Sequence, residues 1–91
     1  METEMILDAS HIEYLRLVSE GIVHLWWNPS RTISKYVSTD WANGRRDINQ
    51  RAAAQMKALG MTHVVSNRGI LAIELTEKGE KVLIEEDEAW A

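Results

Sequence analysis

Apolar positions recur at helical spacing between residues 43 and 60, and this stretch organises the rest of the chain. An apolar stripe that a core must cover runs along one face: Ile48, Ala52, Met56 and Leu59. The opposite face is polar or small: Arg46, Gln50, Ala53 and Lys57. Gly60 stands just past the last apolar position, where glycine commonly ends a helix. The pattern predicts an amphipathic helix with a basic outer face.

Two apolar-rich runs follow this helix and predict a β-hairpin. Residues 66–69, Ser-Asn-Arg-Gly, separate the runs and have the composition of a hairpin turn with a cation at its tip. In the second run Leu71, Ile73 and Leu75 occupy alternate positions, so one face of that strand is expected to be buried. Thr76 then caps a short C-terminal helix.

The N-terminal half predicts two further helices. Ser10 and Glu13 match a capping box at the start of a helix over about residues 10–20. Pro29 suits the first position of a second helix over about residues 29–39, because a missing N–H costs nothing there. Two helices joined by a turn, the second more basic, form the helix-turn-helix pattern, and a helix followed by a hairpin resembles a recognition helix and its wing. The predicted fold is α+β, mostly α: a winged helix-turn-helix with three helices, a two-stranded wing and a short C-terminal helix.

Composition indicates one globular domain over residues 1–91, with residues 1–7 and 85–91 expected to fray. Hydrophobic residues make up 45% of the chain and charged residues 26%, which is ordinary for a soluble protein. The absence of cysteine excludes disulfides and thiolate metal sites. The apolar runs are too short to span a bilayer and the acidic start does not resemble a signal peptide. We therefore expect a cytoplasmic protein, located in the host cytoplasm if its source is viral.

The net charge of −4 hides a segregation along the chain. Residues 1–20 hold five acids and one base, residues 21–73 hold seven bases and two acids, and residues 74–91 hold seven acids and two bases. Because a local field depends on local charge, the basic middle can attract phosphate although the whole chain is acidic. The basic part coincides with the predicted recognition helix and wing.

Candidate contacts to DNA follow from this placement. Arginine can grip guanine in a bidentate way, asparagine or glutamine can do the same for adenine, and alanine can touch a thymine methyl group. The predicted base-reading edge is Arg45, Arg46, Asn49, Gln50, Ala53 and Lys57. The predicted phosphate and wing contacts are Arg31, Lys35, Asn67 and Arg68. By helical projection Arg51 lies nearer the core edge and is expected to serve phosphate or an internal acid.

Two segments resemble a known group of regulators. They are Ala58-Leu59-Gly60-Met61, which leaves the third helix, and the run from Leu75 to Leu83, which reads LTEKGEKVL. Both are similar to segments of winged-helix regulators of the MarR and PadR type and of small winged-helix proteins from phages and archaeal viruses, and the resemblance spans about residues 8–84. It implies a dimeric duplex-DNA binder, with the third helix in the major groove and the hairpin tip at the minor groove. The expected function is transcriptional regulation, with repression by occupancy.

Other function classes are weighed against this one. An enzyme is not expected, because the three histidines lack metal-ligand spacing and no glycine-rich phosphate loop is present, so no catalytic residue, metal or cofactor is predicted. The alternative is a winged helix that binds protein, through a patch containing Trp26 or Trp27 together with Trp90, because tryptophan is a frequent interface residue. A phage-type inhibitor of a host nucleoprotein complex is a third hypothesis, for which acids gathered at the two ends give little support.

Overall fold

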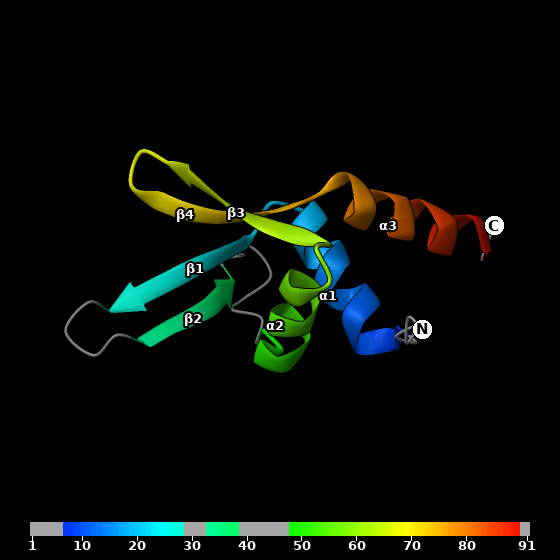
Figure 1. Cartoon of the computed structure of the whole chain (residues 1–91), viewed down its shortest axis with the longest axis horizontal. Coiled ribbons are helices and arrows are strands. Elements are labelled where there is room, and N and C mark those ends of the chain that lie inside the picture. The colour runs from blue at the N-terminus through cyan, green and yellow to red at the C-terminus, as the bar shows by residue number, and fades with distance from the viewer. Residues whose placement is uncertain (1–6, 29–32, 39–47, 90–91) are drawn as a thin grey trace.

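The computed structural model describes residues 7–28, 33–38 and 48–89. Within this part the chain forms helix, hairpin, helix, hairpin and helix in succession (Figure 1). The elements are α1 (Ala9–Ser19), β1 (Val23–Asn28), β2 (Ile33–Ser38), α2 (Gln50–Ala58), β3 (Thr62–Asn67), β4 (Ile70–Leu75) and α3 (Glu77–Ala89). The fold is α+β, as predicted.

The four strands form one antiparallel sheet in the order β2-β1-β4-β3. Each hairpin is paired along its whole length, and the two hairpins meet where His24 of β1 lies opposite Ala72 of β4. From that junction the hairpins extend to the same side of the molecule and diverge, while the helices gather at the other end (Figure 1).

The first helix is the centre of the core. Leu15 is 0% exposed, and Tyr14 and Val18 are also buried. They share one cluster with Val23 of β1 and Ile73 of β4, because alternate strand residues face the helix layer. Apolar burial on this face supplies the main stabilisation of the domain.

One polar atom in this core has no partner within the described residues. The Tyr14 hydroxyl is buried without a hydrogen bond, and its ring meets the ring of Tyr36 edge to face with centroids 6.3 Å apart. Burial, and then the nearby Tyr36, raises the pKa of Tyr14 well above its ordinary value. The phenol therefore stays neutral, and its aromatic packing is its main contribution here.

The predicted helix over residues 29–39 is wrong. Residues 33–38 form β2 instead, in a hairpin with β1, and residues 29–32 lie outside the described part. The sequence pattern placed Tyr36 and Val37 on one helical stripe, but on a strand these neighbours point to opposite faces. The described part therefore contains four strands and three helices, where the prediction had two strands and four helices.

The remaining predicted elements are found. The first helix is α1, although its N-cap is Asp8 with His11 as the reciprocal partner, two residues before the predicted box. The hairpin of β3 and β4 turns at Arg68 (φ +52°) and Gly69 (φ +84°), both in the left-handed region that two-residue hairpin turns require. The C-terminal helix is α3, which reaches Ala89.

The start of α3 is locked onto the turn between α2 and β3. The Thr76 hydroxyl donates to the Gly60 carbonyl and accepts from the Gly79 N–H, and the Thr76 N–H donates to the Met61 carbonyl at 3.0 Å. Lys78 Nζ also donates to the Leu59 carbonyl at 2.9 Å. A Cβ atom at Gly79 would lie 2.1 Å from the Met61 carbonyl oxygen. The Leu-Thr-x-x-Gly segment is thus a backbone junction that needs glycine at its last position.

We expect Gly79→Ala to destabilise the protein by about 1–3 kcal/mol, because backbone must move to admit the methyl group although alanine is the better helix former. Urea unfolding measures this change. Glu77→Ala, in the same turn of α3 and exposed, is the matched control and should stay within about 0.5 kcal/mol. Equal stability of the G79A variant and the native protein would contradict the close approach.

Candidate nucleic-acid interface

One side of α2 faces solvent and carries two cations. Its exposed residues after the N-cap are Arg51, Ala54, Lys57 and Ala58. On the other side Ala52, Ala53 and Met56 are buried against the core. Between the two cations the exposed side chain is the small Ala54, so a large ligand can approach the backbone of α2 closely.

The prediction of Ala53 as a base-reading residue is wrong. Ala53 is 0% exposed and belongs to the core cluster with Leu15 and Met56. Two adjacent positions, 52 and 53, are both buried because α2 contacts both α1 and the sheet. Because the buried face is wider than predicted, the centre of the solvent side is displaced. Arg51, which is expected near the core edge by helical projection, is exposed.

Gln50 is also unsuited to base reading, because its amide is already fully engaged. Its Oε1 accepts from the Tyr36 N–H at 2.9 Å, and its Nε2 donates to the Tyr36 carbonyl at 2.8 Å and to the Ile48 carbonyl at 3.1 Å. Tyr36 lies on β2, the edge strand, so Gln50 satisfies backbone groups that a further strand would otherwise pair. Its role is to fix the start of α2 against the sheet.

The other predicted DNA contacts that the structure describes lie on three elements: α2, the β3–β4 turn and β2. Asn49 is exposed and caps α2 by accepting from the Ala52 N–H at 3.0 Å, while Lys57 is exposed. Arg68 is exposed at the β3–β4 turn, and Lys35 is exposed on β2, opposite Trp26 of β1. Outside the described part lie Arg31, Arg45, Arg46 and the side chain of Asn67.

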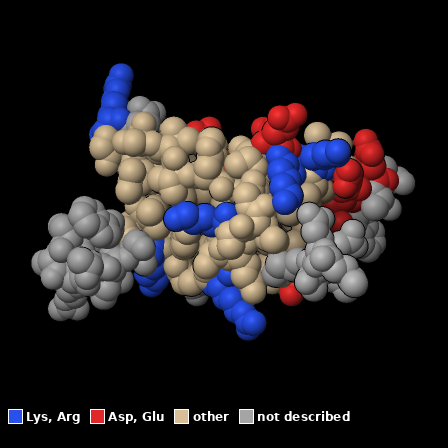
Figure 2. Space-filling view, in the orientation of Figure 1, with Lys and Arg blue, Asp and Glu red and all other residues tan. Residues whose placement is uncertain are grey.

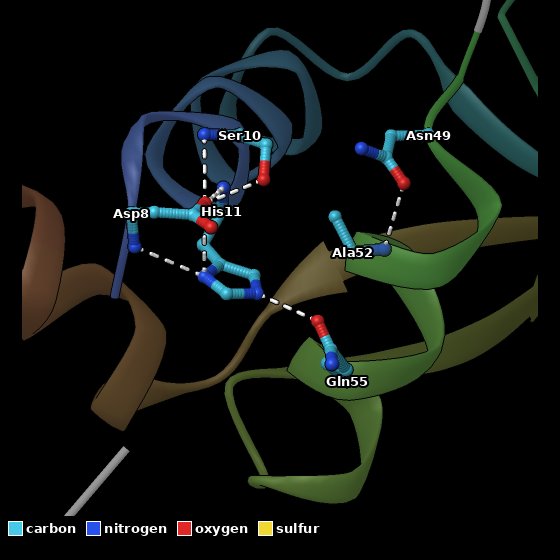
Figure 3. Close-up of polar contacts among 6 residues, drawn as sticks. All are labelled: Asp8, Ser10, His11, Asn49, Ala52 and Gln55. Carbon is cyan, nitrogen blue, oxygen red and sulfur yellow. Dashed lines mark hydrogen bonds and ion pairs between the residues drawn. The ribbon is translucent and has the colours of Figure 1, made fainter. Parts of the chain in front are cut away.

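A polar cluster joins the N-terminal end of α1 to the middle of α2 (Figure 3). The imidazole of His11 is buried, accepts at Nδ1 from the Asp8 N–H at 3.1 Å and donates from Nε2 to Gln55 Oε1 at 2.7 Å. Nδ1 also lies 3.2 Å from the Asp8 carboxylate, so the ring is held from both of its nitrogens. His11 therefore couples the cap of α1 to the middle of α2.

Beside this cluster is a polar pocket of about 400 Å³. Asn49 and Arg51 line it from α2, and the Asp8 carboxylate lines it from α1. The Ser10 hydroxyl, and then the His11 N–H, hold the pKa of Asp8 below its ordinary value of 3.8. The pocket thus combines one cation, Arg51, with one anion, Asp8.

Acidic side chains of the described residues gather at one end of the molecule, where Lys and Arg side chains also lie (Figure 2). From residue 48 to residue 73 the chain has three bases, Arg51, Lys57 and Arg68, and no carboxylate side chain. Figure 2 shows most of the visible Asp and Glu side chains at the end of the molecule where α3 lies. The α2 and β3–β4 surface is therefore the part best suited to an anionic ligand.

No protein-family model, curated protein sequence or solved structure matches the chain. Within the described residues, no three His, Asp or Glu side chains are placed to hold a metal ion. None of the described helices is long and apolar enough to cross a membrane.

We expect Gln50→Ala to destabilise the protein by about 1–3 kcal/mol, since both backbone groups of Tyr36 lose their partner. Chemical denaturation measures the loss. Arg51→Ala, at the next and exposed position, is the control and should stay within about 0.5 kcal/mol. A Q50A variant as stable as R51A would contradict the structural role of Gln50.

Asp8→Ala should lower the thermal midpoint at neutral pH, because the cap of α1 is lost. The folded-state pKa of Asp8 is lowered, so its contribution is present above pH 3.8 and is lost as the pH falls through the folded-state pKa. The midpoints of the native protein and the variant should therefore converge in acid. Thermal melts by circular dichroism between neutral and acidic pH test this, and a constant difference would refute it.

Proposed function

We propose that this protein is a small duplex-DNA-binding regulator that represses transcription by occupying its site. The observation that carries the proposal is the solvent side of α2, where Arg51 and Lys57 flank exposed alanine and where residues 48–73 contain no Asp or Glu. A helix with this surface can enter a major groove, because small residues permit close approach and the cations contact phosphate.

The hairpin of β3 and β4 supports the same proposal as a wing. It follows α2 directly, and Arg68 projects from its turn, where a narrow minor groove concentrates negative potential. Lys35 on β2 adds a further cation from the other hairpin. In this winged-helix interpretation α2 is the recognition helix, and the β1–β2 hairpin stands where a second helix was expected.

The proposal gives phosphate contact a larger share than base reading. Of the six predicted base-reading residues, Ala53 and Gln50 are committed to the fold and Asn49 caps α2. Lys57 and Arg51 are left as described cations on the helix, and long flexible cations contact phosphate readily. Arg45 and Arg46 keep their proposed role in base reading. We propose further that the protein is cytoplasmic, has no catalytic activity and can form a homodimer.

The second candidate function is a protein-binding winged helix, and one observation favours it. The Trp26 side chain is 51% exposed on β1, although burial of a ring this large would be stabilising. Exposed tryptophan is frequent at interface hot spots. Trp26 could therefore contact a partner protein, whereas the side chains of Trp27 and Trp90 lie outside the described part.

We expect the protein to bind mixed-sequence duplex DNA at about 50 mM salt and to lose affinity steeply by about 200 mM, as counterions compete for phosphate. Lys57→Gln should lower the slope of log affinity against log salt by about 0.9. Fluorescence anisotropy of labelled duplex measures both effects, and Arg68→Ala should weaken binding to all sequences alike.

Lys81→Gln is the matched control, because Lys81 is also exposed but lies on acidic α3. It should leave the salt slope unchanged. Absence of binding at low salt, or equal effects of K57Q and K81Q, would refute the assignment of α2 as the DNA-binding surface. A Trp26→Ala variant with unchanged DNA affinity would show that Trp26 lies outside the DNA-binding surface, which leaves it available to a protein partner.

A further inference from the structure

We propose that a groove between α1, β4 and α3 binds a cationic amphipathic peptide segment of a partner protein. The groove has a volume of about 740 Å³, within the range of ligand-binding clefts. It is lined by the C-terminal end of α1, by residues 72–75 of β4 and by one side of α3. None of the residues proposed to contact DNA lines it, so the two surfaces are separate.

The groove has an apolar base and an exposed apolar wall. Val18 and Leu83 are buried and form part of its base, while Ile84 of α3 lines it with 57% of its surface exposed. Covering an exposed aliphatic side chain beside a groove removes apolar surface from water, and this favours binding of a partner. The base and Ile84 together can receive one or two apolar side chains of a peptide.

The rim of the groove is acidic. Glu74 of β4 and Glu80 and Asp87 of α3 line it, and no Lys or Arg does. Arg16 reaches Asp87 from α1 at 2.8 Å, but both side chains are about half exposed or more, and such pairs are easily exchanged. Carboxylates from two elements around an apolar base complement a segment that places lysine or arginine beside its apolar residues.

The same charges argue against other occupants. In a symmetric dimer built on this groove, each acidic rim would face its copy, and like charges in contact are costly. Nucleic acid and anionic membrane surfaces would be repelled for the same reason. A short amphipathic helix is the suitable form, because apolar anchors one turn apart can enter the groove while cations contact its rim.

The first experiment selects ligands without assuming a sequence. A displayed library of random peptides of about 12 residues, enough for three helical turns, is selected on the full chain and counter-selected on the Ile84→Gln variant. The proposal predicts enriched peptides that are net positive and carry apolar residues three or four positions apart. No enrichment over the variant, or enrichment of acidic or purely polar peptides, would overturn it.

The second experiment places the bound peptide with a matched pair of variants. Ile84 and Ile70 are exposed to nearly the same degree, 57% and 58%, but only Ile84 lines the groove. We expect Ile84→Gln to weaken a labelled, selected peptide about tenfold, which is about one buried aliphatic contact, and Ile70→Gln less than about twofold. Circular dichroism confirms that both variants are folded. Equal effects of the two substitutions would overturn the site.

Charge is tested in the same way. Replacing Glu74 and Glu80 together by Gln should weaken the peptide about tenfold at low salt, whereas replacing Glu77 and Glu85, which lie outside the groove, should have less than about a threefold effect. Equal losses would mean that the acidic chain attracts the peptide only in a general way, and would overturn the proposal.

Sedimentation equilibrium measures the oligomeric state. A dimer that Ile84→Gln dissociates would show that a second copy of the chain occupies the groove, and would overturn the proposal of a peptide. Because Lys57→Gln tests DNA binding alone, either proposal can fail without the other.

Discussion

The packing of α1 against both α2 and the sheet is the constraint on which the other elements depend. Leu15 of α1 and Met56 and Ala53 of α2 are all 0% exposed, and the alanine allows the two helices to lie close together. His11 and Gln55 add one partly buried polar bond between α1 and α2, which helps to fix the rotation of α2 about its axis. That rotation decides which side chains of α2 are available to a ligand. The basic surface is therefore a consequence of core packing.

Elements that local chemistry determines were predictable from the sequence. Arg68 and Gly69 set the β3–β4 turn through their backbone conformation, and Thr76 caps α3 through a side-chain bond within its first turn. The β1–β2 hairpin was not, because the sheet that includes it also contains β4, where Ala72 lies opposite His24 although it is distant in sequence. Short apolar runs with aromatic residues fit a strand or a helix equally well until such a partner is known.

The errors in the predicted site follow from that missed hairpin. Without β2 there is no backbone for Gln50 to bond, so its amide appears free on the outer face of α2. Without a sheet beside α2, a single stripe through Ala52 and Met56 seems enough to bury the helix, and Ala53 appears exposed. Alanine gives no signal of its own, since it suits a close contact and a solvent face equally. Lys57, whose neighbours do not depend on β2, was placed correctly on the solvent side.

The α3 junction explains how one small domain can present two surfaces of opposite charge. Bonds from Thr76 and Lys78 to the carbonyls of residues 59 and 60 tie the acidic helix to the end of the basic one. These bonds fix where α3 begins relative to the end of α2. A ligand that gains from one surface loses at the other, which favours two ligands of opposite charge on different sides of the molecule. In the proposed scheme DNA lies against the exposed side of α2, and the cationic segment of the partner lies in the groove of α1, β4 and α3, which none of the proposed DNA contacts lines.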